Sequence, residues 1–257
     1  MSLSGRVGLV TGGRTGIGFT IAKAFAANGA KVYITGRRLE VLERAAASVT
    51  GVSGSIVPLQ MDVTDEESTL AGAKHIDGID GKLDIVVNNA GFARSLRDPD
   101  FAAKKLAAAD PLEPETVQNW IDIFAINTIA PFFVVRAFQS LLIKGAHSRP
   151  QGTSSVINIS SGSAKMNLSP TILSLAYSST KVALEKLSLV LGTSFAERNI
   201  PIRLLKTKPP PGLAAAVPAR RHGTEAEMGM TAVYLAASDY TNGAILNIDG
   251  GMSLVNP

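Results

Sequence analysis

The sequence of 257 residues contains no cysteine and only three histidines, and this composition excludes several kinds of functional site. Without cysteine, the chain has no disulfide framework, no thiolate metal site and no cysteine nucleophile. His75, His147 and His222 are far apart in the sequence and lack the spacing of zinc ligands, so we expect no metal site.

Charged residues are also few, at 18% against 46% hydrophobic residues, which excludes a disordered chain. The basic residues behind the net charge of +4 are dispersed, and their only adjacent pairs are Arg37-Arg38, Lys104-Lys105 and Arg220-Arg221. Nucleic-acid-binding proteins usually concentrate positive charge on one stripe or carry a recognisable module. We therefore expect a solvated basic surface and no nucleic-acid partner.

The sequence also lacks a signal-peptide core, because only residues 7–10 form an apolar run before Thr11. The most apolar later stretch, Ile121 to Ile143, is interrupted by polar residues and one proline: Asp122, Asn127, Pro131, Arg136 and Gln139. We interpret this stretch as a buried helix rather than a membrane span. The expectation is a soluble, cytoplasmic protein with no membrane partner.

Strand-like and helix-like segments alternate along the chain, which predicts an α/β fold. Apolar runs predict strands at residues 7–10, 31–35, 55–59, 83–87 and 155–160, and helical spacing predicts helices at 17–28, 39–49, 117–144 and 176–199. Such alternation implies right-handed crossovers, so we predict a single Rossmann-type, doubly wound parallel sheet with helices on both faces. Because we find no linker or repeat, residues 1–257 are interpreted as one domain.

Two segments depart from this alternation. Residues 93–115 contain Pro99, Pro111 and Pro114 and are predicted to be a loop with at most one helical turn. Residues 206–218 contain two lysines and Pro209-Pro210-Pro211-Gly212 where a sixth buried strand should end.

A glycine-rich turn, residues 11–18 (Thr-Gly-Gly-Arg-Thr-Gly-Ile-Gly), joins the first predicted strand to the first predicted helix. Glycines allow a tight turn and close backbone approach, and free N–H groups at a helix start attract an anion, so this turn predicts a phosphate-binding site. An ordinary strand-to-helix turn is the alternative, and the position at the first such junction disfavours it. A P-loop is excluded because Phe19-Thr20 follows Gly18.

Arg37 and Arg38 follow the second predicted strand, where an NAD site would place an acidic residue. An arginine at this place accommodates a 2′-phosphate, and Arg14 could be a second cation on the same phosphate. The alternative is that both arginines only solvate a helix start, where a cation is mildly unfavourable. We predict NADP(H) as the cofactor.

Tyr177 and Lys181 are four residues apart near the start of a predicted helix, so they share one helical face. A nearby ammonium favours the phenolate and lowers the pKa of a tyrosine, which suits acid-base catalysis. Such a pair alone is common on solvated helix faces. Its significance depends on the other motifs.

Taken together, these motifs resemble the short-chain dehydrogenase/reductase family. Three further segments match: Asn88-Asn89-Ala90-Gly91, Asn158-Ile159-Ser160-Ser161 and Asn247-Ile248-Asp249-Gly250-Gly251. The resemblance covers roughly residues 5–251 and is greatest to NADP-dependent reductases of ketones and 3-oxoacyl groups.

The resemblance implies specific roles for individual residues. Tyr177 would be the general acid, Lys181 would hold the nicotinamide ribose and lower the tyrosine pKa, and Asn127 would support a proton-relay water. Ser161 would orient the substrate, although it lies 16 residues before Tyr177, about three more than is usual, so Ser160 and Ser163 stay alternatives. The expected cofactor-binding residues are Gly12, Arg14, Thr15, Gly16, Ile17, Gly18, Arg37, Arg38, Asp62, Val63, Asn89, Ala90, Gly91, Tyr177 and Lys181.

The sixth strand of the family normally continues to a Pro-Gly pair and a helical lid over the substrate. Here Lys206 and the residues after it replace the apolar strand end, and only residues 213–216 separate Pro211-Gly212 from the segment that resembles the chain after the lid. We therefore expect a shortened substrate lid around residues 205–217. Residues 93–115 either cover the substrate site in place of this lid or form an exposed surface loop.

These observations predict an NADPH-dependent oxidoreductase that transfers a hydride between nicotinamide and a carbonyl or secondary alcohol substrate. The intact Tyr177–Lys181 pair favours this enzyme, whereas the shortened lid favours a nucleotide-binding sensor or scaffold with little catalysis. The resemblance, with the broadly apolar helices 117–144 and 176–199, also predicts a homo-oligomer, either a tetramer or a dimer.

Overall fold

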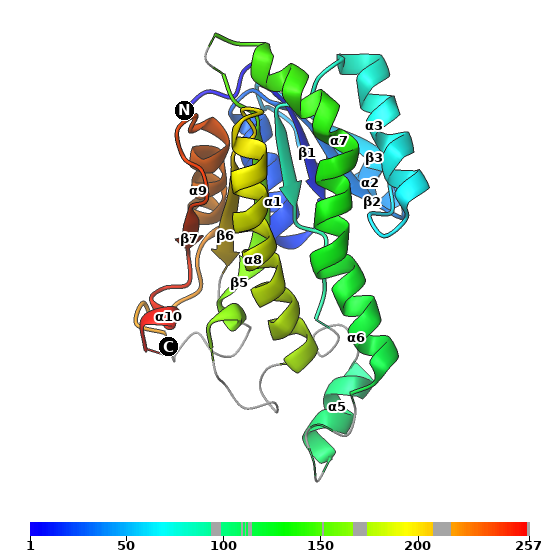
Figure 1. The fold of residues 1–257 in the computed structure, drawn as a ribbon, viewed down its shortest axis with the longest axis vertical. Coiled ribbons are helices and arrows are strands. Elements are labelled where there is room, and N and C mark those ends of the chain that lie inside the picture. The colour runs from blue at the N-terminus through cyan, green and yellow to red at the C-terminus, as the bar shows by residue number, and fades with distance from the viewer. Residues whose placement is uncertain are drawn as a thin grey trace.

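The central strands form from short apolar runs that are buried on both faces of a parallel sheet. All residues of β1 (Val7–Thr11) and β4 (Ile85–Asn88) are buried. The computed structural model describes residues 1–93, 99–108, 110, 112, 115–150, 152–166, 174–207 and 217–255. These residues contain a seven-stranded parallel sheet with the strand order β3-β2-β1-β4-β5-β6-β7 (Figure 1). The other strands are β2 (Lys31–Gly36), β3 (Ser55–Gln60), β5 (Ser155–Ser161), β6 (Ile202–Thr207) and β7 (Ile245–Asn247).

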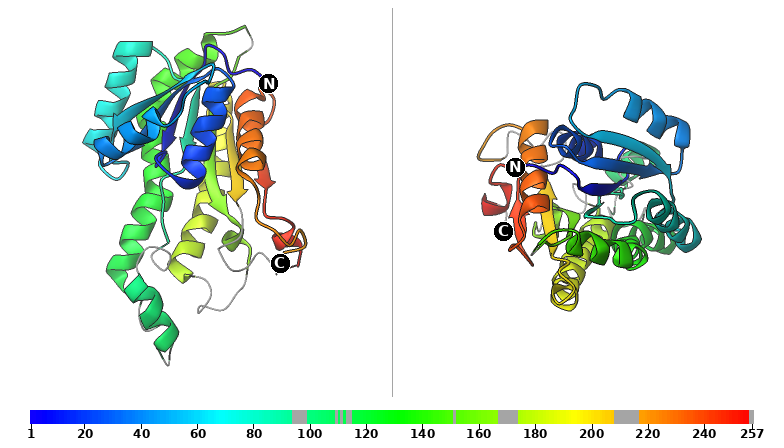
Figure 2. Two further views of the ribbon diagram at one scale, coloured as in Figure 1. Left: turned by 180° about the vertical axis from the view of Figure 1, so that it is seen from behind. Right: turned by 90° about the horizontal axis from the view of Figure 1, so that it is seen from above.

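Helices cover both faces of the sheet (Figure 2). One layer contains α1 (Gly16–Ala27), α2 (Leu39–Ala47) and α9 (Glu225–Ala237), and the other contains α3 (Glu66–Asp80), α7 (Ala130–His147) and α8 (Leu175–Ala196). Successive residues of β1 enter the two cores, since Val10 belongs to the same cluster as Phe25 of α1, and Leu9 to the same cluster as Phe138 of α7. The predicted doubly wound α/β fold is confirmed.

The strand order reverses direction between β1 and β4, because β2 and β3 lie on one side of β1 and β4 to β7 on the other. In open α/β sheets, ligands bind in the crevice at the carboxyl ends of strands where this reversal occurs. The glycine-rich turn follows β1, and Asn89 follows β4. The fold therefore brings two of the predicted cofactor-binding motifs to the same edge of the sheet.

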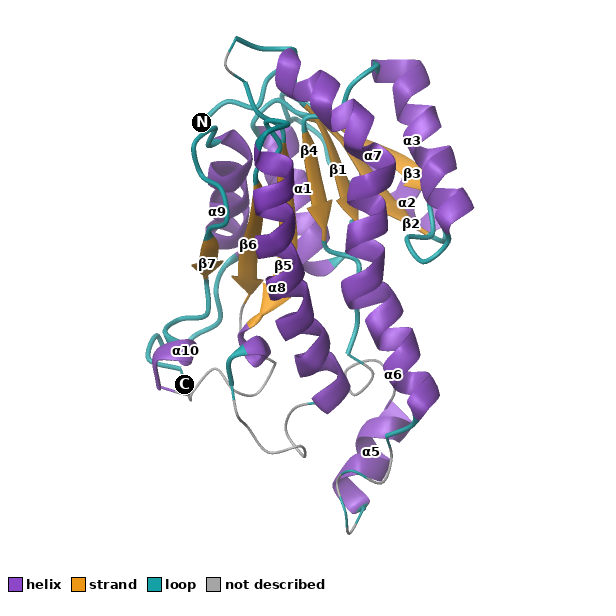
Figure 3. Cartoon of the chain, viewed as in Figure 1, coloured by secondary structure: helices purple, strands orange, loops and turns teal. Residues whose placement is uncertain are grey.

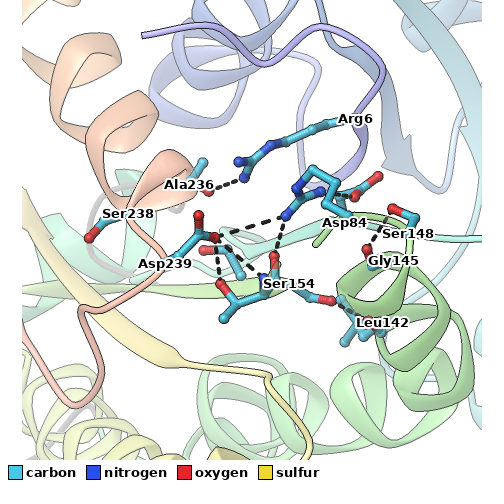
Figure 4. Close-up of polar contacts among 12 residues, drawn as sticks. Arg6, Asp84, Leu142, Gly145, Ser148, Ser154, Ala236, Ser238 and Asp239 are labelled. Atoms are coloured by element: carbon cyan, nitrogen blue, oxygen red, sulfur yellow. Dashed lines mark hydrogen bonds and ion pairs between the residues drawn. The ribbon is translucent and has the colours of Figure 1, made fainter. Parts of the chain in front are cut away.

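A cluster of charged residues joins the opposite, amino-terminal ends of the central strands (Figure 4). The fully buried Asp84 accepts a hydrogen bond from the Val7 backbone N–H at 2.8 Å and from Arg149 at 2.6 Å, and it lies 3.1 Å from the Lys82 ammonium. Arg6 donates to the Ala236 carbonyl at 2.7 Å. These contacts tie β1, β4 and the ends of α7 and α9 together, away from the candidate site.

The structure corrects two expectations about irregular segments. Residues 93–115 contain the nine-residue helix α5 (Pro99–Ala107), more than the single helical turn expected. Proline is compatible with the first turn of a helix, and the buried Phe101 anchors this one. Strand β6 also continues through Lys206 to Thr207 with every residue buried, so Lys206 does not interrupt the strand.

The predicted helix 117–144 is one continuous helical run (Figure 3). Its three parts are α6 (Val117–Phe124), a π-helical segment η1 (Ala125–Ile129) and α7. By length and composition, the run Val117–His147 could cross a membrane. Its residues Val134, Val135 and Phe138 instead pack in the core against the sheet, as a buried helix would. The short elements η2 (Gly162–Ala164) and α10 (Met252–Val255) complete the described chain.

The expected shortening of the substrate lid concerns residues 205–217, of which 208–216 lie outside the described residues. Residues 205–207 are the buried end of β6, and Val217 packs with Met166 and Met252. The expectation about the lid itself stays a prediction.

Candidate active site

A cavity of about 1260 Å³ opens at the carboxyl ends of the strands. Its lining comes from the turns after β1, β2, β3 and β4, from the ends of β5 and β6, and from α6 and α8. The predicted site residues in this lining are Gly12, Arg14, Thr15, Gly16, Ile17, Arg37, Arg38, Asp62, Val63, Asn89, Ala90, Gly91, Tyr177 and Lys181. Gly18, Asn127 and Ser161 are not among the described residues that line it.

At two positions of the glycine-rich turn, a Cβ atom would come too close to neighbouring atoms. Gly12 has φ +63°, and a Cβ there would lie 3.0 Å from the Cα atom of Ala90. A Cβ at Gly18 would lie 2.3 Å from Asn89 Nδ2. The glycines therefore allow the turn after β1 to pack directly against the turn after β4.

The start of α1 offers free backbone donors to the cavity. Thr15, the N-cap residue of α1, makes no side-chain capping hydrogen bond, and neither does Arg38 at the start of α2. Uncapped N–H groups at a helix start form a ready anion site. Because Thr15 lines the cavity, this end of α1 can bind a phosphate group.

Three arginines line the cavity near the end of β2. Arg14 is half-buried, and Arg37 and Arg38 are exposed. Across the described part of the chain, their guanidinium groups have no hydrogen-bond or ion-pair partner. Gln60 Nε2 donates to the Arg37 carbonyl at 2.9 Å and steadies the turn that carries two of them. This corner of the cavity is positively charged, and no carboxylate in the described residues pairs with its guanidinium groups.

Thr11 is a structural part of the site that sequence reasoning missed. Its Oγ1 accepts hydrogen bonds from the backbone N–H groups of Asn89 and Ala90, both at 3.0 Å. The Asn89 side chain donates in turn to the Thr11 and Gly12 carbonyls at 2.9 and 3.2 Å. The predicted cofactor residue Asn89 therefore braces the glycine-rich turn as well as lining the cavity.

Asp62 holds its own turn after β3 in a fixed shape. Its Oδ1 accepts from the Thr64 N–H at 3.0 Å and from the Thr64 hydroxyl at 2.7 Å. Asp62, Val63 and Thr64 all line the cavity. The predicted Asp-Val pair therefore lies in the cavity wall.

Helix α8 places Tyr177 and Lys181 on the cavity wall, as the four-residue spacing predicts. Ser174 Oγ caps the helix by accepting from the Tyr177 N–H at 3.3 Å. The Lys181 ammonium lies 5.5 Å from the centre of the Tyr177 ring and donates to the Ile159 carbonyl at 2.8 Å. Both side chains share the cavity with the glycine-rich turn.

Burial changes the proton affinities of this pair in opposite directions. Burial raises the pKa of Tyr177, and a hydrogen bond with Ser161 acts in the opposite direction. Burial lowers the pKa of Lys181 to about 8, against the raising effect of the Glu185 carboxylate. The expected lowering of the tyrosine pKa by Lys181 is not found in the free protein, because desolvation of the phenol dominates.

The structure distinguishes the three candidate serines by their contacts. Ser161, at the end of β5, hydrogen-bonds with Tyr177 and accepts from the Ser163 N–H at 3.2 Å. Ser160 lines the cavity, but its hydroxyl donates to Glu185 at 2.7 Å. The Ser163 hydroxyl is buried without a hydrogen-bond partner in the described residues. Ser161 is the serine that contacts the tyrosine.

Asn127 lies in the π-helical segment and is fully buried. Its Nδ2 donates to the Phe92 carbonyl at 3.0 Å and to Thr180 Oγ1 at 3.1 Å, and its Oδ1 accepts from the Phe92 N–H at 3.1 Å. A π-helical turn adds one residue to a helix and is frequent at functional sites. Here it turns Asn127 toward α8, where it links the turn after β4 to the residue beside Lys181.

Polar residues of α6 also line the cavity, and the sequence motifs did not identify them as site residues. Gln118, Asn119 and Asp122 line it, and Gln118 Nε2 donates to Asp122 Oδ1 at 2.7 Å.

Ala93 and Thr116 lie at the two ends of the long connection and border the cavity, but no described residue of α5 does. Because α5 extends beyond α6 and away from the sheet (Figure 1), it does not cover the site.

Known proteins resemble this chain over nearly its whole length. The family model described as short chain dehydrogenase matches residues 6–216. Gluconate 5-dehydrogenase of Gluconobacter oxydans (strain 621H) is 31% identical, over 98% of this chain and 96% of that protein. Short-chain dehydrogenase/reductase VdtF of Byssochlamys spectabilis is 32% identical, over 97% and 93%. The solved Pseudomonas aeruginosa RhlG/NADP active-site complex is 26% identical, with a TM-score of 0.82 over 98% of both chains.

Proposed function

Because the chain belongs to the short-chain dehydrogenase/reductase family, whose members are NAD(P)-dependent oxidoreductases, we propose that it is an NADPH-dependent carbonyl reductase, reversibly an alcohol dehydrogenase. The observation that carries this proposal is the meeting of Tyr177, Lys181 and Ser161 beside the glycine-rich turn. A protein that only sensed or displayed the nucleotide would not need these three groups together. The enzyme is therefore preferred to the sensor or scaffold.

The residues of the cavity fit a dinucleotide. The uncapped start of α1 and the close approach at Gly12 and Gly18 suit its pyrophosphate. Asp62 and Val63 are proposed to contact the adenine, and Asn89 to Gly91 the adjacent ribose. When bound, the cofactor supplies or accepts the hydride.

Arg14, Arg37 and Arg38 support NADP over NAD, because three guanidinium groups that pair with none of the described residues lie in one corner and suit a 2′-phosphate. In the double variant Arg14→Ala/Arg37→Ala, we expect NADPH to bind more weakly by about 1.5–3 kcal/mol per lost contact, with NADH binding unchanged. Fluorescence titration of both cofactors measures this. Arg44→Ala, an exposed arginine of α2 outside the cavity, is the matched control. Tighter binding of NADH than of NADPH by the parent protein would contradict the assignment.

In the proposed reaction, Tyr177 protonates the substrate oxygen. Burial raises the pKa of its phenol, so Tyr177 carries its proton at neutral pH and can donate it from the Oη atom. The Ser161 hydroxyl, hydrogen-bonded to the same tyrosine, is placed to orient the carbonyl. Lys181, fixed by the Ile159 carbonyl, presents a cation on the cavity side of α8, and Asn127 steadies the helix next to it.

Tyr177→Phe tests this role directly. We expect NADPH affinity to stay nearly unchanged and the rate of carbonyl reduction to fall by at least ~10²–10⁴-fold, as for a lost general acid. Steady-state rates on a panel of ketones, 3-oxoacyl thioesters and quinones, with a parallel NADPH titration, measure both quantities. Tyr240→Phe is the control, because Tyr240 is fully exposed. Parent-like turnover in Tyr177→Phe would show that another group donates the proton.

We further propose that residues 1–257 act as one catalytic domain in the cytoplasm and assemble as a homo-oligomer, either a tetramer or a dimer. The relatives named above align over more than nine tenths of their own length, which supports a single catalytic unit. Apolar side chains on the outer faces of α6 and α8 support self-association, since Val117 is 79% exposed, Ile121 55% and Val182 51%.

A further inference from the structure

A lysine is buried in the sheet next to the proposed catalytic residues. Lys206, in β6, is 0% exposed, although charged side chains are almost never fully buried without a partner. Its ammonium lies 2.7 Å from Glu185 Oε1 and forms an ion pair with it. The angle at this contact does not meet hydrogen-bond geometry, so the ammonium makes no hydrogen bond within the described residues. No other group in the described chain pairs with the Lys206 ammonium.

The same Glu185 oxygen has a second donor. Ser160, which is paired with Lys206 in the register of β5 and β6, donates its hydroxyl to Glu185 Oε1 at 2.7 Å. The Glu185 side chain is only 14% exposed. The ammonium and the hydroxyl therefore hold this carboxylate in place from two sides.

Glu185 also stands one helical turn after Lys181 on α8, so it faces a second ammonium. Residues four apart on a helix are neighbours, and the negative charge of Glu185 opposes the effect of burial on the pKa of Lys181. We infer that Glu185, held by Lys206 and Ser160, is a positioning residue that keeps Lys181 in its charged form at neutral pH. This inference deepens the proposed function and rests on it for its catalytic meaning.

Other charged groups around Lys181 do not replace Glu185. The elements packed against α8 here are β5, β6, α6, η1 and η2. β5, η1 and η2 contain no charged side chain. β6 contributes Lys206 and Arg203, of which Arg203 is bound at the opposite end of the strand. α6 contributes Asp122, which is engaged by Gln118, and Tyr177 on α8 is neutral when protonated.

The test is the pKa of Lys181 itself, measured without any substrate. The chain is labelled with ¹³Cε-lysine, and the Lys181 signal, identified by its loss in Lys181→Arg, is followed by NMR from about pH 4.5 to about pH 10. In Glu185→Gln we expect the titration midpoint to fall by about two pH units, because a unit charge about 6 Å away at an effective dielectric near 20 contributes about 2.8 kcal/mol. In Lys206→Met we expect a smaller rise, because the variant loses a positive charge that opposes protonation of Lys181, while Ser160 still holds Glu185.

Two further variants complete the design. Glu185→Gln/Lys206→Met contains no buried unpaired charge, and its midpoint should lie below the parent value but above that of Glu185→Gln. If Glu185→Gln does not fold, this double variant carries the test. Lys186→Met removes an exposed lysine beside Glu185 and should leave the midpoint unchanged. A midpoint that is unchanged in both Glu185 variants, or shifts of the same sign in Glu185→Gln and Lys206→Met, would overturn the inference.

The pH profile of kcat/KM for carbonyl reduction separates this inference from the proposed function. If Lys181 acts in the proposed reaction, the profile should move with the NMR midpoint and in the same direction. Shifted NMR midpoints with an unmoved profile, or with no reductase activity in any variant, would support the role of Glu185 and contradict the proposed function. A purely structural role would lower rates without moving either midpoint.

Discussion

Methionine in place of Lys181 removes an ammonium whose burial opposes folding, so we expect Lys181→Met to increase the free energy of unfolding at pH 7. Lys181 is 6% exposed, and its pKa is lowered from 10.5 to about 8, chiefly by burial. That difference corresponds to about 3 kcal/mol of destabilisation at neutral pH. Methionine has a similar length and no charge to desolvate.

One contact is lost in this variant, since Lys181 donates to the Ile159 carbonyl at 2.8 Å. A hydrogen bond of this kind contributes about 1 kcal/mol. The expected net gain is therefore about 2 kcal/mol, or roughly 4–8 °C in Tm for a chain of this size.

The gain should depend on pH in a direction that follows from the lowered pKa. Below about pH 8, Lys181 is protonated in both states and the full penalty of burial is present. From about pH 8 to pH 10.5, the unfolded chain holds a proton that the folded chain has released, so the stability of the parent rises with pH. At a pH near 9.5 the penalty is smaller by about 2 kcal/mol, and parent and variant should be nearly equal in stability.

Urea denaturation at pH 7 and pH 9.5, followed by circular dichroism, measures these differences. Lys186→Met is the matched control, because Lys186 is exposed on the same helix and should change stability little at either pH. A Lys181→Met protein that is less stable than the parent at pH 7, or that shows the same gain at both pH values, would refute the argument from burial.

Two other predictions concern parts of the molecule outside the proposed chemistry. Asp84→Ala should lower the free energy of unfolding by about 3 kcal/mol, because it leaves Arg149 and Lys82 without their buried carboxylate. Asp77→Ala, which removes a half-exposed pair with Lys144, should cost less than about 1 kcal/mol in the same denaturation assay, and equal losses would contradict the distinction. Light scattering at micromolar concentration should give a dimer or tetramer rather than a monomer, since the outer faces of α6 and α8 expose apolar side chains.

The fold was predictable because its signals are local. Strands buried on both faces appear as short apolar runs, and the predicted strands 7–10 and 155–160 end within one residue of β1 and β5. Gly29 correctly marks the end of α1, where it has φ +94°. The spacing of Tyr177 and Lys181 predicted their shared wall, because both lie on one regular helix.

The remaining features depend on contacts between distant segments, which no local pattern encodes. The prolines of residues 93–115 suggested a loop, but Pro99 occupies the first turn of α5, where proline is tolerated. The sequence pattern placed the end of the apolar strand at Lys206, because a lysine is rarely buried without a partner. Its partner, Glu185, lies on another element and cannot be identified from the local sequence. The direction of the Tyr177 pKa shift was likewise not local, since it follows from how deeply the tertiary structure buries the phenol.

Burial gives the two groups of the proposed catalytic pair different tasks. Their ordinary pKa values are close, 10.0 for tyrosine and 10.5 for lysine, and burial moves the first up and the second down to about 8. Tyr177 therefore keeps its proton throughout the neutral range, as an acid for carbonyl reduction must. Lys181 is the member of the pair whose charge changes near neutral pH, so the pH dependence of the proposed reaction should enter through Lys181. Any group that shifts the Lys181 equilibrium, as we infer for Glu185, then sets the pH at which the enzyme works.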